Sequence, residues 1–175
     1  MKYRFALLLC LLSCVTGLVL TPAASLAAPP TVIPSATGAD PSSSDKQLFL
    51  EMKAAAKPYQ AAMRENSKAL DQLKKTLTIE VAASRIRIQE LQEISVTKTE
   101  SDLLADQLTT LRALIEEIQT NVGILGQEMT ILRGFTEDLD MDGMIQSFED
   151  AIEVQEQRIE LVEAALALVR AIAAP

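Results

Sequence analysis

The side chains that could do chemistry in this chain are few, and nearly all of them are carboxylates. The 175-residue sequence contains no His, and its two cysteines, Cys10 and Cys14, lie in an N-terminal apolar stretch. Nucleophile pairs of the Ser-His and Cys-His kinds need residues that the rest of the chain lacks, as do zinc sites built from His and Cys. A di-iron bundle needs Glu-x-x-His motifs, which are also absent. We therefore expect a protein that is not an enzyme.

Carboxylates at regular spacing form the one motif that points to an ion. Residues 138–149 fit the pattern D-x-D-x-D-G-x-x-x-x-x-E at every fixed position. Over these residues only, the chain resembles the calcium loop of the EF-hand family. The resemblance implies a calcium site, with dissociation constants in the range of extracellular modules, roughly 0.1 to 1 mM. Its ligands would be Asp138, Asp140, Asp142, Met144 through its backbone carbonyl, Gln146 and Glu149.

The same acidic residues also fit a simpler arrangement, a turn that caps the next helix. Asp is favoured at helix N-termini, where its side chain accepts hydrogen bonds from free amides. Gly134 and Phe135 interrupt the helix that should precede an EF-hand loop, and the chain has no second loop of this kind. Both interpretations remain open from the sequence. The carboxylates further along form an acidic helix face that we expect to be solvated: Glu153, Glu156, Glu160 and Glu163.

Two runs of apolar residues should position this acidic segment between two helices. In each run the spacing alternates between three and four, which is the pattern of a seam along which one helix packs on another. The first seam is Leu104, Leu108, Leu111, Ile115, Ile118, Val122, Leu125, Met129 and Leu132. The second is Ile145, Phe148, Ile152, Gln155, Ile159, Val162, Leu166, Val169 and Ala173. We expect helices over 98–133 and 143–174 to form an antiparallel hairpin, with Gly134 at the C-cap of the first.

A longer helix over 45–94 should lie along the hairpin. Ser44 and Gln47 have the spacing of a capping box at its start, and Pro58 should kink or split it. A polar, β-branched stretch at 94–97 predicts a tight turn before the next helix.

Additional apolar residues outside the first seam favour a bundle of three or more helices over an isolated two-stranded coil. These residues, which should widen the apolar face, are Leu103, Leu114, Ile124 and Ile131. Gly123 and Gly126 mark either weak points of the helix or places where backbones approach closely.

The N-terminal segment has the features of an export signal. Lys2 and Arg4 precede an apolar core, and small residues before Ala28 fit cleavage after Ala27. A lipoprotein anchored at Cys14 is an alternative, but the residues that follow Cys14 are still apolar. Residues 28–44 are rich in Pro and Ser and predict a disordered linker.

The sequence therefore predicts an exported all-α protein: a signal peptide (1–27), a linker (28–44), and a helical hairpin or three-helix bundle (45–175). We expect a periplasmic or secreted scaffold, adaptor or assembly subunit that binds a protein partner or self-associates, with no membrane span after cleavage. A calcium-responsive binding protein and a holdase-type chaperone are the alternatives. The net charge of −8 argues against a nucleic-acid partner, since phosphate binding needs a basic face.

Overall fold

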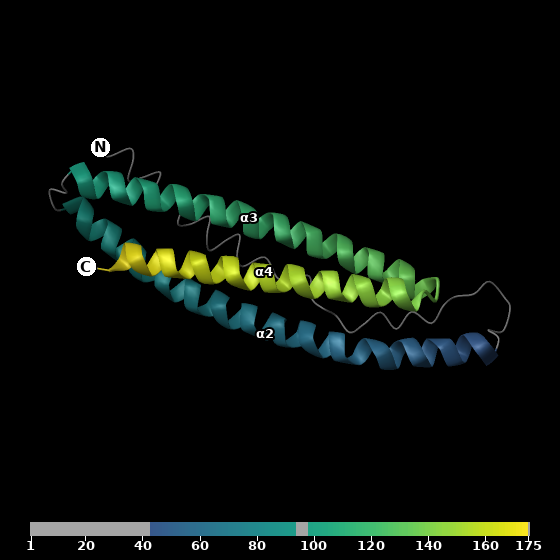
Figure 1. Ribbon diagram of the computed structural model, residues 1–175. Helices are drawn as coiled ribbons and strands as arrows, with labels where there is room; N and C mark the ends of the chain where they lie inside the picture. The colour runs from purple at the N-terminus through teal and green to yellow at the C-terminus, as the bar shows by residue number, and fades with distance from the viewer. Residues whose placement is uncertain (1–42, 94–97, 175) are drawn as a thin grey trace. The chain divides into compact units, whose positions relative to one another are not determined.

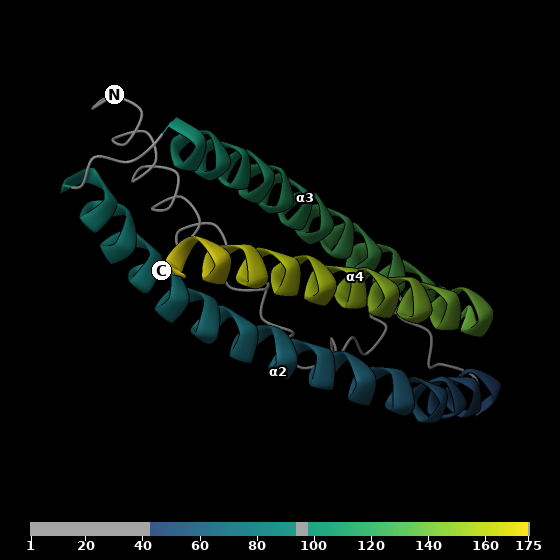
Figure 2. The ribbon, with the colours of Figure 1, turned by 60° about the vertical axis from the view of Figure 1, so that its left-hand side comes forward.

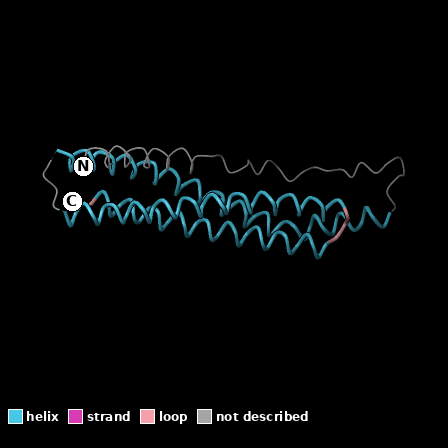
Figure 3. The backbone as a smooth tube through the Cα atoms, turned by 90° about the horizontal axis from the view of Figure 1, so that it is seen from above, coloured by secondary structure: helices cyan, strands magenta, loops and turns pink. Residues whose placement is uncertain are grey.

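The computed structural model describes residues 43–93 and 98–174, and 97% of this part is helical. The helices are α2 (Ser43–Glu93), α3 (Lys98–Glu137) and α4 (Met141–Ala173), shown in Figure 1. Apart from the turn that joins α3 to α4 and the end of the chain after Ala173, Figure 3 draws every described segment as helix. The predicted all-α helical bundle is confirmed, whereas the predicted signal peptide, residues 28–42 of the linker and the turn at 94–97 lie outside the described residues. No helix among the described residues is long and apolar enough to cross a bilayer.

Helix α2 continues without a break through Pro58. Of the two predicted effects of this proline, a kink or a split, the split is therefore wrong. A proline inside a helix removes one backbone hydrogen bond and costs about 3 kcal/mol or more. Here the Pro58 side chain is exposed, while Ala56 is buried and Tyr59 is partly buried against the same hydrophobic core. We infer that packing on both sides of the proline holds the helix together. Ser43 and Ser44, predicted as the end of the linker, belong to the first turn of α2.

The described residues divide into two compact units, and each unit contains part of every helix. Unit 1 comprises residues 68–93, 98–120 and 158–174, and unit 2 comprises 43–67 and 121–157. The buried apolar core of unit 1 is Leu70, Leu77, Val81, Leu104, Leu108, Leu111, Ile115, Ile118, Val162, Ala165, Leu166, Val169 and Ile172. The core of unit 2 is Met52, Ala56, Met63, Leu132, Met144, Phe148 and Ala151. Each unit thus has its own hydrophobic core.

The two predicted seams lie inside these cores, because every residue of both seams is buried or half-buried. Ile115 is 9% exposed, and Ile159 packs against the core of unit 1. In unit 2 the end of α3 and the start of α4 are joined by a short turn, and the Ser147 hydroxyl on α4 donates to the Glu128 carbonyl on α3 at 3.1 Å. The antiparallel hairpin is therefore formed as predicted.

The most deeply buried line on α4 shares Phe148, Gln155, Val162 and Val169 with the predicted seam and departs from it at the other positions. Helix α4 contacts both α2 and α3, and in Figures 1 and 2 its C-terminal part lies beside α2. A helix with two neighbours is most enclosed along the line between its two contact stripes. That line is Met144, Phe148, Ala151, Gln155, Arg158, Val162, Ala165, Val169 and Ile172. It carries small and polar residues, which the apolar pattern alone does not detect.

Candidate functional site

The acidic segment begins where α3 ends, and α3 ends four residues later than the predicted end at residue 133. Helix α3 runs past Gly134 to Glu137, so the prediction of a C-cap at Gly134 is wrong. The amide of Asp140 donates to the Phe135 carbonyl at 2.9 Å, which is the long backbone bond of a Schellman motif. Leu139 takes the left-handed conformation, with φ of 57°, that glycine usually supplies. Leu139 and Phe135 both pack against the core of unit 2, and we infer that this packing offsets the strain.

Asp140 then caps the N-terminus of α4. Its Oδ1 accepts a hydrogen bond from the Gly143 amide at 3.0 Å, and its carbonyl accepts one from Met144 at 3.1 Å. This is the N-cap geometry, in which a side-chain oxygen satisfies an amide that has no partner inside the helix. The negative charge of Asp142, in the first turn, also interacts favourably with the positive end of the helix dipole. The structure therefore contains the helix cap that was one of the two interpretations of the acidic residues.

Among the other predicted calcium ligands, Gln146 and Glu149 form hydrogen bonds with other side chains. Met144 is buried in the core of unit 2, and Gln146 donates to Asp150 at 2.9 Å. Glu149 accepts a hydrogen bond from the Tyr59 hydroxyl at 3.2 Å, while Asp138 and Asp142 are exposed. From Met141 onward the segment is helical, and within residues 43–93 and 98–174 no three acidic side chains form a group that could hold a metal ion. The six residues do not fit a calcium loop in this arrangement, and calcium binding stays a prediction.

Tyr59 links α2 to α4 in unit 2. Its ring stacks on Phe148 with a centroid distance of 5.7 Å and an angle of 13° between the ring planes. Desolvation, together with the hydrogen bond to Glu149 and its negative charge, raises the pKa of the Tyr59 hydroxyl. Tyr59 therefore stays protonated and acts as a donor, which makes it a structural link between two helices rather than an acid or base.

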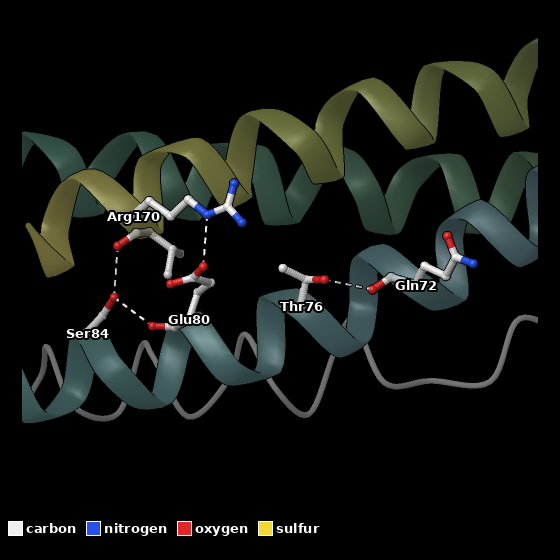
Figure 4. A network of polar contacts seen from close by, with 6 residues as sticks. Gln72, Thr76, Glu80, Ser84 and Arg170 are labelled. Atoms are coloured by element: carbon white, nitrogen blue, oxygen red, sulfur yellow. Dashed lines mark hydrogen bonds and ion pairs between the residues drawn. The ribbon is translucent and has the colours of Figure 1, made fainter.

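In unit 1 a small polar network connects α2 with the end of α4 (Figure 4). The Ser84 hydroxyl lies 2.8 Å from the Val169 carbonyl and 3.0 Å from the Glu80 carbonyl, and Ser84 is fully buried. Arg170 Nε donates to Glu80 Oε1 at 2.9 Å. An ion pair this exposed is worth about 0 to 1 kcal/mol, so the buried Ser84 contact is the more specific of the two. The network positions the two helices relative to each other within unit 1.

Two buried cations in unit 1 were not foreseen from the sequence. Arg158 is 1% exposed, and its Nε and Nη1 have no hydrogen-bond partner among the described residues. Lys74 is also buried, and its Nζ lies 4.0 Å from the carboxylate of Asp71. Burial, followed by the positive charge of Arg158, lowers the pKa of Lys74. The signal that the sequence offered was spacing, since Arg158 follows Gln155 of the predicted seam by three residues and precedes Val162 by four.

Large apolar side chains also remain on the outer surfaces of the helices. Leu103, Ile124 and Ile131, expected to widen the packed face of α3, are exposed, so that prediction is wrong for these three residues. Among the described residues α3 packs on α4, and these three side chains lie outside that contact. On α2, Ile79 and Ile86 are 69% and 60% exposed. Sequence reasoning missed this pair, although its seven-residue spacing was visible.

The glycines of α3 lie on one of these outer surfaces. A Cβ atom added at Gly123 or Gly126 would meet nothing within 4 Å, so neither glycine serves a close approach of backbones within the described part of the chain. Both line an open groove of about 470 Å³ in unit 2, together with Gln127, Thr130 and Ile131. The groove is shallow and follows one helix, which suits another helix better than a small molecule.

Comparison of the chain with protein-family models, with curated proteins and with solved structures finds no match in any of the three. The functional argument therefore depends on the chemistry and surfaces of this chain alone.

Proposed function

We propose that this protein is an exported, non-catalytic assembly subunit that associates with further copies of itself through the outer apolar faces of its helices. The observation that carries the proposal is the spacing of the exposed isoleucines. Ile79 and Ile86 on α2 are seven residues apart, and so are Ile124 and Ile131 on α3. Residues seven apart lie on one side of a helix, and such pairs are typical of helix–helix contacts.

The exposure of four large apolar side chains, Ile79, Ile86, Ile124 and Ile131, supports a role in association. Fully burying one isoleucine side chain is worth about 1.5 to 3 kcal/mol. Exposed apolar residues scattered singly need no explanation, but ordered patches on a soluble protein mark interaction sites. Two glycines inside α3, Gly123 and Gly126, strengthen the argument, because each costs about 1 kcal/mol relative to alanine. A neighbouring helix that packs closely on Gly123 and Gly126 would account for them.

Export is part of the same proposal. The positive start, apolar core and small residues before Ala28 support a signal peptide that is cleaved after Ala27, placing the protein in the periplasm or outside the cell. The chain beyond that point would contain no cysteine and could form no disulfide. Its folded state would then depend on helix packing, which agrees with the two helical cores described above.

Light scattering coupled to size-exclusion chromatography tests the proposed function. We expect the wild-type chain to have the mass of a dimer or larger assembly at micromolar concentrations. Replacing Ile79 and Ile86 by Gln, or Ile124 and Ile131 by Gln, should lower that mass while helicity by circular dichroism is unchanged. A matched variant, Ala164→Gln on α4, should leave the mass unchanged. A strictly monomeric wild-type chain at every concentration would refute the proposal.

A further inference from the structure

The outer face of α2 in unit 1 carries a short, continuous apolar stripe. Ile79 and Ile86 are its two large members, and Ala82 and Ala83 lie between them. All four residues are exposed, and their spacing of three, four and seven places them on one side of the helix. The opposite side of the same segment, with Leu77 and Val81, is buried in the core of unit 1. The stripe is therefore a second apolar face that has no partner among the described residues.

The charges at the two ends of this stripe are opposite. Lys75 precedes Ile79 by one helical turn, and Glu90 follows Ile86 by one turn. Both side chains are exposed and lie on the same side of α2 as the stripe. The pattern is thus symmetric about the midpoint between Ala82 and Ala83, with a cation at one end and an anion at the other.

We propose that two copies of the chain pair through this stripe with their α2 helices antiparallel. The proposal rests on the self-association proposed above and specifies the surface and its geometry. A two-fold axis at the midpoint places each Ile79 against Ile86 of the partner subunit, and each Ala82 against Ala83 of the partner subunit. The small alanines allow the helices to approach closely at the centre.

Charge complementarity favours a second copy of the chain as the partner of this stripe and makes the two α2 helices antiparallel. In the antiparallel arrangement Lys75 lies beside Glu90 of the partner subunit, and this ion pair occurs twice. In a parallel arrangement with the same register, Lys75 would lie beside Lys75 of the partner subunit, and the two glutamates would also meet. Like charges at such positions destabilise helix pairing, whereas opposite charges stabilise it and fix the orientation.

Charge reversal in the full-length chain tests the pairing. Lys75→Glu and Glu90→Lys should each weaken dimerisation about tenfold, because both ion pairs become repulsive. The double variant should restore the dissociation constant to within about threefold of wild type. Glu90 also pairs with Arg87 on its own helix, at 3.2 Å, so Lys75→Glu is the cleaner single change. Glu163→Lys, an exposed carboxylate on α4, is the matched control and should have no effect.

Disulfide trapping gives the orientation directly in a chain whose Cys10 and Cys14 are replaced by Ser. Ala82→Cys lies at the two-fold axis and should cross-link two copies under mild oxidation. Lys75→Cys alone should not cross-link, but chains that carry both Lys75→Cys and Glu90→Cys should. Cross-linking of Lys75→Cys with itself would overturn the antiparallel pairing. If the chain dimerises and none of these substitutions changes its dimerisation, the proposed surface is wrong but self-association stands. If the wild-type chain is monomeric, the proposed function itself is wrong.

Discussion

The same substitution, glycine to alanine, should have opposite effects at two sites in unit 2. At Gly143, in the first turn of α4, an added Cβ would lie 2.5 Å from Phe135 Cδ1 and 2.8 Å from Asp140 Oδ2. Both distances are too short for a carbon atom, so the Phe135 ring or the Asp140 cap must move. Overpacking of this kind costs about 1 to 3 kcal/mol, and a lost cap about 1 kcal/mol, against a helix-propensity gain of at most about 1 kcal/mol. We therefore expect Gly143→Ala to destabilise the protein by about 1 to 3 kcal/mol.

Gly123→Ala is the matched control, because nothing lies within 4 Å of the added Cβ there. In a single subunit only the propensity term remains, so stability should rise by up to about 1 kcal/mol when it is measured at concentrations where the chain is monomeric. Urea unfolding followed by far-ultraviolet circular dichroism measures both variants, and the slope with denaturant should not change. In a Phe135→Leu background, Gly143→Ala should cost less, since the clashing ring atoms are gone. Equal stabilisation at both sites would refute the packing that we describe around the turn.

Three further predictions concern buried charge and the acidic segment. Arg158→Met should raise the free energy of unfolding by about 1 to 4 kcal/mol in thermal or urea unfolding, because it removes a buried cation whose Nε and Nη1 have no hydrogen-bond partner in the described part of the chain. A loss of stability would mean that the guanidinium is satisfied. Burial and Arg158 lower the pKa of Lys74, so the unfolded chain binds more protons than the folded chain between that lowered pKa and about pH 10.4. The free energy of unfolding should therefore increase with pH in this window. The increase should be absent in Lys74→Met. Calcium, if residues 138–149 bind it, should raise the melting temperature of the wild-type chain and not of Glu149→Gln, and the absence of any shift at millimolar calcium would end the EF-hand interpretation.

The helices and their inward faces could be predicted because they follow from a regular apolar spacing. The seven-residue interval is typical of one face of a packed helix. It separates Leu111 from Ile118 on α3 and Val162 from Val169 on α4, and all four residues are buried. Only part of the most buried line of α4 could be found in this way. The line also contains Ala151, Arg158 and Ala165, whose burial depends on α4 having neighbours on two sides rather than on their own hydrophobicity.

The ends of helices and the outer surfaces were harder to predict, for different physical reasons. Gly134 looked like a helix stop, but Phe135 and Leu139 gain enough contact with the core of unit 2 to extend α3 and to hold a leucine at positive φ. Leu103 and Ile131 looked like core residues because apolar type alone does not say which faces find a partner. The acidic residues have a sequence that fits both a cap and an ion loop, and the structure shows the cap at Asp140.

Sedimentation equilibrium of the wild-type chain over a wide concentration range tests the central claim, that the outer helix faces are contact surfaces between copies. We predict a reversible monomer–dimer equilibrium whose dissociation constant increases when Ile79 and Ile86 are replaced by Gln. A single monomeric species at the highest concentration reached, with and without those substitutions, would contradict the account.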